Sequence, residues 1–267
     1  MLTLPRLAAV AVHPGGLQVA TGGCDRFTRP AEACAAGQVR LWDARSGEPL
    51  GAPLTAADQV IALHFTRDGQ RLQAIDRRGH VLTWDLASRA ATPAPAIPRP
   101  DRRMQLADDL VALADDTTLT LHDLNTGRDR DLAFPTRGPI AALTLAPDAA
   151  TLAAAACSDP ACTTTELLVW RTRDAAVLHR LSAGPVTRLD LAADNHQLAA
   201  ASRDASVQVW DLATGTSFTL VPEFDPLAPS DLRFSPDGQQ LATIACRAPD
   251  CSTSATVVHL WSLAERR

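Results

Sequence analysis

The sequence contains no lysine and no tyrosine, and all 25 of its basic residues are arginine. The net charge of −5 leaves no basic excess to neutralise phosphates, which argues against a nucleic-acid partner. No apolar run approaches the roughly 18 residues of a membrane-spanning helix. The nucleophile elbow, the phosphate-binding loop, the dinucleotide-binding glycine motif and paired metal-ligand histidines are also missing. We therefore expect no enzyme, no cofactor, no metal and no membrane insertion by this chain.

The sequence does contain a repeated segment that ends in Trp-Asp. The clearest copy is VQVWD at Val207–Asp211, and related copies end at Asp43, Asp85, Asp123, Arg171 and Ser262. All five tryptophans occupy this pattern: Trp42, Trp84, Trp170, Trp210 and Trp261. His122 takes the tryptophan place in the remaining copy. The tryptophans are 42, 86, 40 and 51 residues apart, and a period of roughly 40–50 residues with a strand ending in Trp-Asp is typical of propeller blades.

A tight turn inside an apolar alternation forms the second landmark of each repeat. The best copy is LRFSPDG at Leu232–Gly238, and VAVHPGG at Val10–Gly16 is another. Proline presets the backbone of such a turn, and aspartate with glycine closes it. Because a turn with flanking alternation indicates a hairpin, each repeat is predicted to contain four antiparallel strands, named a to d. We interpret the apolar run at Leu7–Val12 as such a strand and not as a signal peptide.

These patterns predict an all-β chain, a β-propeller of about six four-stranded units in a single domain of residues 1–267. The units span about 7–55, 60–98, 102–135, 139–182, 185–221 and 229–265. Residues 1–5 have the pattern of an outer strand. Two interpretations stay open: this segment completes the last unit and closes a ring, or the chain is part of a longer array.

The repeated segments resemble the WD-repeat β-propeller family over nearly the whole chain. The segment GQVRLWDARSGEPLGAPL, at Gly37–Leu54, is most similar to bacterial WD-repeat regions, which often form the C-terminal sensor part of large signalling proteins. The resemblance implies buried structural tryptophans and an aspartate between strands b and c that ties strands together. Asp116 and Asp204 match that aspartate, whereas Arg78 replaces it in the second unit. The family's Gly-His pair is absent, so tryptophan is expected to act mainly by packing.

Six cysteines form three pairs, at the same place in three units. The pairs are Cys24 with Cys34, Cys157 with Cys162, and Cys246 with Cys251. Each first cysteine lies ten residues after the proline of its turn, and its mate follows in the same b–c connection. Three interpretations stay open, namely hairpin disulfides, reduced thiols and, least favoured by the spacing, a metal site. The chain is cytoplasmic by default and extracytoplasmic if the pairs are disulfides.

The b–c connections are longer and chemically more varied than the a–b and c–d turns. We predict a loop at Asp25–Ala33 that carries Arg26, Phe27 and Arg29, a composition typical of protein contacts. Phe224 is a similar candidate. The sequence thus predicts a non-catalytic scaffold or sensor module that binds an unidentified protein. The alternative is a propeller hydrolase or a small-ligand-binding propeller, but strand a is mostly apolar in the four repeats where it reads LAAVAV, VIALHF, PIAALTL and PVTRLDL, and it offers no cluster of catalytic groups.

Overall fold

The computed structural model describes residues 7–28, 33–97, 103–134, 138–221, 228–246 and 256–263. These residues form strands and turns, and none of them is helical, so no described helix could cross a membrane. The strands pair into six small antiparallel sheets, each of which joins strands that are consecutive in the sequence. The predicted fold class is confirmed, because the sheets are consistent with WD-repeat blades.

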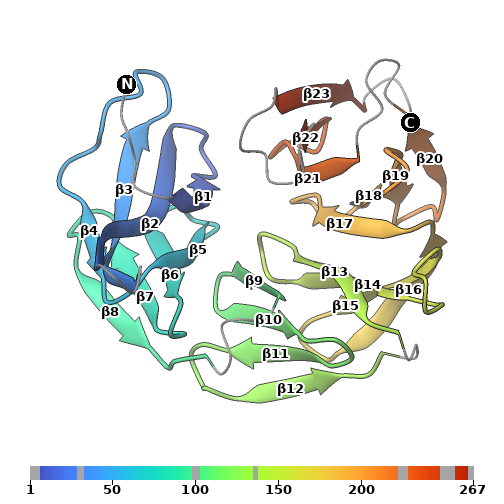
Figure 1. Ribbon diagram of the computed structural model, residues 1–267, viewed down its shortest axis with the longest axis horizontal. Coiled ribbons are helices and arrows are strands. Elements are labelled where there is room, and N and C mark those ends of the chain that lie inside the picture. The colour runs from blue at the N-terminus through green and yellow to red at the C-terminus, as the bar shows by residue number, and fades with distance from the viewer. Residues whose placement is uncertain are drawn as a thin grey trace. The chain divides into compact units, whose positions relative to one another are not determined.

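We number the sheets 1 to 6 in chain order (Figure 1). Sheet 1 contains β1 (Leu7–Val12), β2 (Gln18–Thr28), β3 (Ala33–Asp43) and β4 (Leu54–Ala56). Sheet 2 contains β5 (Val60–Phe65), β6 (Arg71–Asp76), β7 (Val81–Asp85) and β8 (Ala91–Ala94). Sheet 3 contains β9 (Arg103–Ala107), β10 (Leu110–Ala114), β11 (Leu119–Asp123) and β12 (Asp129–Leu132).

The second half of the chain continues the same order of strands. Sheet 4 contains β13 (Ile140–Leu145), β14 (Thr151–Cys157), β15 (Thr165–Arg171) and β16 (Ala176–Ala183). Sheet 5 contains β17 (Val186–Leu191), β18 (Gln197–Ser202), β19 (Val207–Asp211) and β20 (Ser217–Leu220). Sheet 6 has three strands among the described residues: β21 (Pro229–Phe234), β22 (Gln240–Cys246) and β23 (Thr256–Ser262). Residues 1–5, the predicted outer strand, lie outside the described residues.

The chain divides into two compact structural units, which are not the six repeat units predicted from the sequence. The first comprises Met1–Val111 with His122–Asp129, and the second comprises Ala112–Leu121 with Arg130–Arg267. The boundary therefore passes through sheet 3. Nothing in the structure tests whether residues 1–267 form a single domain, so that prediction stays a prediction.

The aspartate of the Trp-Asp segment caps the turn that follows strand c. Asp43 Oδ1 accepts hydrogen bonds from the backbone N–H groups of Arg45 at 2.9 Å and of Ser46 at 2.8 Å. Asp211 does the same in sheet 5, with the N–H groups of Ala213 and Thr214. These hydrogen bonds hold the pKa of Asp43 below its ordinary value. The motif thus has a local cause, since a short carboxylate bonds the backbone two and three residues ahead.

Adjacent sheets within a unit stack face against face. In the second unit, Ala153, Leu167 and Val169 of sheet 4 share one apolar cluster with Leu191 and Trp210 of sheet 5. We call the side of a sheet that the following sheet covers its forward face, and the opposite side its rear face. The tryptophan lies on the rear face and packs against the small strand-b residues of the preceding sheet.

On the side of sheet 6 that corresponds to the forward face of the other sheets, two residues of strand c are exposed. Val258 and Leu260 of β23 are 56% and 72% exposed, whereas Val207 and Val209, at the equivalent positions of β19, are 0% and 1% exposed. The difference follows from the stacking, because sheet 6 covers the forward face of sheet 5: Val207 and Val209 share a cluster with Leu232 and other residues of sheet 6.

Candidate functional site

The cysteine pairs lie at equivalent positions of their sheets. Strand a of sheet 1 pairs Leu7 with Gly23, and strand a of sheet 4 pairs Ile140 with Ala156, so the first cysteine of each pair follows the matching strand-b residue. Cys24 is bonded to Cys34 with a Cα–Cα distance of 5.7 Å, and Cys157 is bonded to Cys162 with a Cα–Cα distance of 4.8 Å. These four are the cysteines whose side chains the structure describes, and each of them is bonded.

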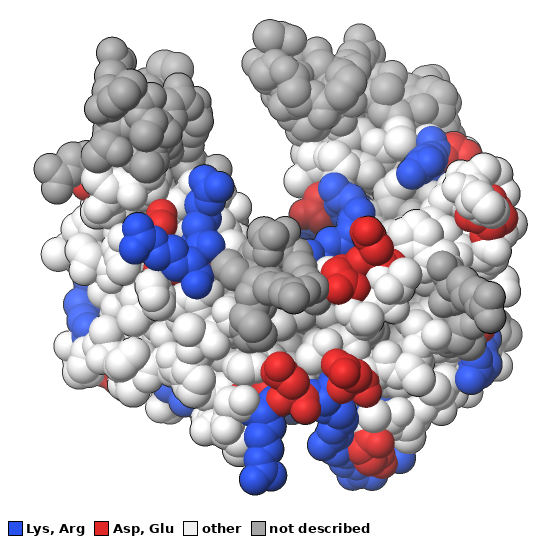
Figure 2. Space-filling view, turned by 60° about the horizontal axis from the view of Figure 1, so that its bottom comes forward, with Lys and Arg blue, Asp and Glu red and all other residues white. Residues whose placement is uncertain are grey.

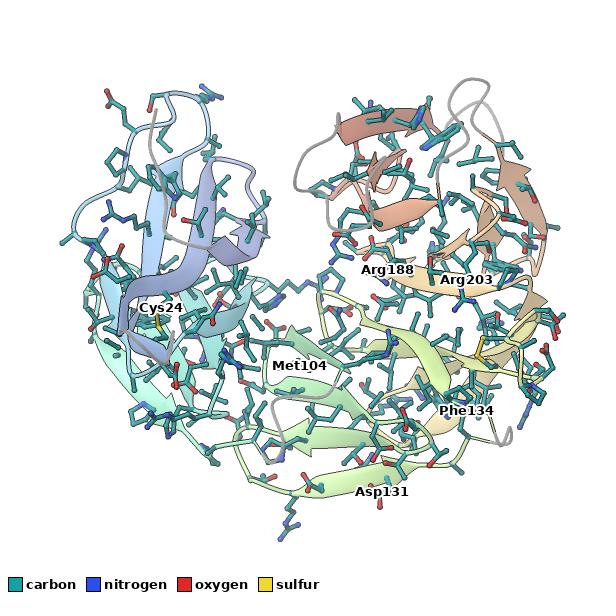
Figure 3. All side chains as sticks on the ribbon, in the orientation of Figure 1. Cys24, Met104, Asp131, Phe134, Arg188 and Arg203 are labelled. Atoms are coloured by element: carbon teal, nitrogen blue, oxygen red, sulfur yellow. A yellow bond between two sulfur atoms is a disulfide. The ribbon has the colours of Figure 1, made fainter. Side chains whose placement is uncertain are left out.

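The first disulfide spans a long hairpin, and here the predicted loop is wrong in its extent. Strand pairing continues past Cys24, with Phe27 opposite Cys34 and Thr28 opposite Ala33. The region expected to be a loop at 25–33 is therefore largely a two-stranded arm, whose pairing shifts register at two places after Cys24. The alternating pattern is weak here, which explains why the sequence did not predict the extra pairs. The yellow bond at Cys24 marks this disulfide (Figure 3).

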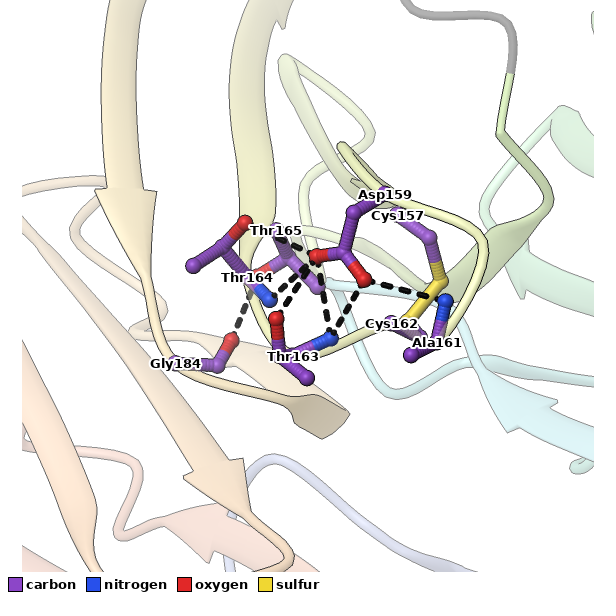
Figure 4. Close-up of a disulfide and its surroundings, with 8 residues drawn as sticks. All are labelled: Cys157, Asp159, Ala161, Cys162, Thr163, Thr164, Thr165 and Gly184. Carbon is purple, nitrogen blue, oxygen red and sulfur yellow. Dashed lines mark hydrogen bonds between the residues drawn. A yellow bond between two sulfur atoms is a disulfide. The ribbon is translucent and has the colours of Figure 1, made fainter.

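The second disulfide closes a short loop that is ordered by one aspartate. Asp159 accepts hydrogen bonds from the backbone N–H groups of Ala161 at 3.0 Å and Thr164 at 3.0 Å, and from the hydroxyl of Thr163 at 2.9 Å (Figure 4). The hydrogen bonds from Thr163 and Thr164 lower the pKa of Asp159 to about 2. The carboxylate therefore stays charged at any ordinary pH, and it holds the loop in one conformation.

The base of this loop is packed against the start of the sheet. The backbone N–H of Cys157 donates to the carbonyl of Pro139 at 3.0 Å, and the hydroxyl of Thr165 donates to the carbonyl of Gly184 at 2.9 Å. A Cβ at Gly138 would lie 1.9 Å from the carbonyl oxygen of Cys157. Only glycine fits at 138, because any other residue would push the loop away from the connection between sheets 3 and 4.

The third pair and most of the predicted contact residues cannot be placed. Cys246 ends β22, while Cys251 lies outside the described residues, as do Arg29 and Phe224. Arg26 and Phe27 belong to strand β2, but their side chains lie outside the part of the chain that the structure describes. The prediction that these residues bind a protein stays a prediction.

Three of the five tryptophans are buried, and the other two donate a hydrogen bond. Trp84, Trp170 and Trp210 are buried, at 2%, 1% and 4% exposed. Trp42 and Trp261, which are less buried, donate from Nε1 to strand-b hydroxyls: Trp42 to Thr21 at 2.8 Å and Trp261 to Thr243 at 3.1 Å. In sheets 1 and 6 the tryptophan therefore also ties strand c to strand b through a side-chain hydrogen bond.

The two aspartates assigned a structural role do not bind a neighbouring strand through their carboxylates. Asp204 is exposed and accepts hydrogen bonds from Ser206 within its own turn. Asp116 is exposed too. The buried carboxylate of this kind is Asp76 in sheet 2, which is 2% exposed and accepts hydrogen bonds from the backbone N–H of His80 at 3.0 Å and from its Nδ1 at 2.9 Å. The Asp-x-x-x-His spacing at the end of a strand b was the available signal.

Charge is mixed over the face drawn in Figure 2, where arginines alternate with acidic side chains. Within the described residues no three His, Cys, Asp or Glu side chains are placed to hold a metal ion. The cysteines that could have ligated one are bonded to each other in the two described pairs. The arrangement offers ordered loops and hydrogen-bonding groups, which suit contact with another surface.

Comparison with known families agrees with the repeat. The model of the family described as "WD domain, G-beta repeat" matches residues 176–211. The chain contains a WD repeat. The match runs from β16, the outer strand of sheet 4, through β19, so the WD repeat in sequence is offset by one strand from the sheet in space. No curated protein matches the chain.

Proposed function

We propose that the chain is a non-catalytic WD-repeat module that binds a protein through its disulfide-bearing b–c connections. The observation that carries this proposal is the position of the two disulfides, at equivalent ends of strand b in sheets 1 and 4. A loop ordered before binding loses less conformational entropy on binding. Loops on a rigid scaffold are also where function commonly lies, and WD repeats commonly mediate protein interactions.

We further propose that the module faces an oxidising compartment and belongs to a larger bacterial signalling protein. Support for the compartment comes from the two disulfides, since such bonds persist where thiols are not kept reduced. Support for the parent protein comes from the resemblance of Gly37–Leu54 to bacterial WD-repeat regions. The absence of an enzyme activity is part of the same proposal, because strand a is mostly apolar in sheets 1, 2 and 4.

The experiment compares two sets of substitutions on a partner identified by crosslinking in the source cell. Arg26→Ala, Phe27→Ala and Arg29→Ala alter the arm of sheet 1, whereas Arg45→Ala and Asn125→Ala alter c–d turns as a matched control. The proposal predicts that the arm variant binds the purified partner at least tenfold more weakly and that the control binds normally. The reverse pattern would place the interface on the side of the c–d turns and refute the proposal.

A further inference from the structure

Sheets 2 and 3 depart from the repeat at two positions whose equivalents meet across the junctions between other sheets. At one strand-b position, sheets 1, 4 and 5 have alanine (Ala20, Ala153 and Ala199), whereas sheet 2 has Gln73, as the pairing with strand a shows. At the strand-c position of tryptophan, sheet 3 has His122. One neighbouring pair of sheets therefore exchanges alanine for glutamine and tryptophan for histidine.

Elsewhere these two positions meet across the junction between consecutive sheets. Ala20 shares a core cluster with Trp84 of the next sheet, and Ala153 shares one with Trp210. Gln73 and His122 occupy the same two places on the junction between sheets 2 and 3, and both belong to the first unit. Sheet 3 does contact sheet 2 here, since Asp108 accepts a hydrogen bond at 3.1 Å from the backbone N–H of Arg67.

The exchange leaves polar atoms buried without a protein partner. Gln73 is 2% exposed and His122 is 3% exposed, and neither Gln73 Oε1 nor His122 Nε2 has a hydrogen-bond partner. His64 Nε2, directly opposite Gln73 in the β5–β6 pairing, has no hydrogen-bond partner either, and it lies 3.8 Å from Asp108 Oδ1. Of four such atoms in the described part of the chain, three therefore lie at this junction. Buried polar atoms almost always have a partner, which in many proteins is an ordered water.

The chemistry of the two main atoms defines what can bind between them. His122 Nδ1 lies 2.6 Å from Asp129 Oδ1, and a carboxylate only accepts hydrogen bonds, so Nδ1 carries the proton. In the neutral imidazole, His122 Nε2 is then a lone-pair acceptor, and Gln73 Oε1 is an acceptor too. Two acceptors cannot bond to each other, but one small molecule with two donor hydrogens can satisfy both.

We propose that the junction between sheets 2 and 3 is a binding site for a buried water molecule. The water donates one hydrogen bond to Gln73 Oε1 and the other to His122 Nε2. Asp129 makes the site possible, because it fixes the tautomer of His122. The side-chain volumes are also compatible with a bound water, since histidine is smaller than the tryptophan it replaces, although glutamine is larger than alanine.

The direct test is a high-resolution crystal structure combined with the tautomer of His122 measured by long-range ¹H–¹⁵N correlation in solution. We expect a solvent peak within hydrogen-bond distance of both atoms, and an unprotonated Nε2. The proposal is overturned if the amide nitrogen of Gln73 donates directly to His122, if a metal ion scatters anomalously at the site, or if Nε2 carries the proton.

A substitution cycle tests whether the two positions face each other. Gln73→Ala with His122→Trp restores the pair found at the other junctions. We expect each single substitution to lower the Tm, by about 2–4 °C for each kcal/mol lost, and the double variant to recover most of that loss. Purely additive effects would contradict the facing arrangement.

The matched control puts the polar pair into an apolar junction, as Ala153→Gln with Trp210→His. Here the residue opposite Ala153 is Thr144 rather than a histidine, so we expect the double variant to melt below both singles or not to fold. A control double variant as stable as the wild type would show that the junction of sheets 2 and 3 has no special capacity for water, and would count against the proposal.

Discussion

The junction between sheets 4 and 5 and the junction between sheets 2 and 3 differ in the side chains that fill them. The first is filled by alanine, leucine and valine under Trp210. The second contains Gln73, His64 and His122, three side chains that each have a polar atom without a hydrogen-bond partner. The repeat thus specifies where side chains meet, while the chemistry of the meeting side chains is free to vary as long as volume and hydrogen bonding are satisfied together.

The strand-a position of His64 also carries a polar residue in two other sheets. It holds His64 in sheet 2, Thr144 in sheet 4 and Asp190 in sheet 5, which the pairing with strand b shows to be equivalent. Asp190 reaches sheet 6, where its Oδ2 accepts a hydrogen bond at 2.7 Å from the backbone N–H of Phe234 and its Oδ1 lies 3.3 Å from Arg233 Nη1. A polar residue is therefore tolerated at a junction when the next sheet supplies its partner.

The largest expected effect compares the two aromatic positions. Trp210→Ala removes a side chain that is 4% exposed and leaves an apolar cavity, so we expect the free energy of unfolding to fall by about 3–5 kcal/mol. His122→Ala removes a smaller side chain with one satisfied nitrogen, and we expect a loss of about 1–2 kcal/mol. Urea unfolding of both variants measures the difference, and equal losses would contradict the distinction between the junctions.

The second prediction concerns the pH dependence of stability that Asp190 causes at the junction between sheets 5 and 6. Burial raises the pKa of Asp190 to about 6, against the opposing effect of Arg233. The folded state thus holds this proton more tightly than the unfolded state, whose carboxyl titrates near its ordinary value of 3.8. The resulting stabilisation is fully present below about pH 4 and is lost as the pH rises through about 6.

Asp190→Asn removes this dependence and keeps an oxygen to accept from Phe234. We expect the free energy of unfolding of the wild type to fall, relative to that of the variant, by up to about 3 kcal/mol between pH 4 and pH 7. Asp231→Asn is the comparison. This carboxylate of β21 in sheet 6 contacts the same arginine at 3.6 Å and contributes to the raised pKa of Asp190, so its removal should weaken the pH dependence without abolishing it. A wild type and an Asp190→Asn variant with parallel pH profiles would refute the assigned cause.

The third prediction compares equivalent covered and exposed positions. Val209→Ser places a hydroxyl at a site that is 1% exposed, and we expect a loss of about 2–3 kcal/mol. Leu260→Ser changes the equivalent residue of sheet 6, which is 72% exposed, and we expect less than about 0.5 kcal/mol. Thermal unfolding of the two variants decides the matter. If Leu260→Ser costs as much as Val209→Ser, its side chain is covered in solution.

The smallest expected effect is the loss of the second disulfide. This loss should not change how much a substitution at either junction destabilises the protein. Replacing Cys157 and Cys162 by serine opens a short loop, which the loop-entropy relation values at about 2 kcal/mol. The difference between Trp210→Ala and His122→Ala should be the same in this background, because distant sites add. Denaturant titrations of the combined variants give the comparison, and a changed difference would mean that the loop and the junctions are coupled.

The sequence predicts much of the fold because each sheet repeats the same local signals. Trp210 with Asp211 and the turn at Leu232–Gly238 suffice to place strands and turns, since alternation and turn chemistry are local. The side-chain partners at the junctions are not local. Nothing in the neighbourhood of Gln73 or His122 in the sequence reveals that the two positions face each other; that follows only once the sheets are stacked.

The candidate site is only partly predictable for a related reason. The equivalent placing of Cys24 and Cys157 follows from counting residues after the turn, but their redox state depends on how close their partners lie in space. The strand pairing beyond Cys24 depends on contacts across the arm rather than on a clean alternation. The role of Asp159 in ordering its loop needs the positions of four donor groups that no short motif encodes.

The central claim is that disulfides hold the b–c connections in a binding conformation, and the most direct measurement is the redox state of the cysteines in protein isolated from its source cell. Free thiols are blocked by alkylation before lysis, and peptides are mapped by mass spectrometry without reduction. The account predicts crosslinked peptides that join Cys24 to Cys34 and Cys157 to Cys162, with no alkylation at these four residues. Alkylated, uncrosslinked cysteines at both pairs would contradict it.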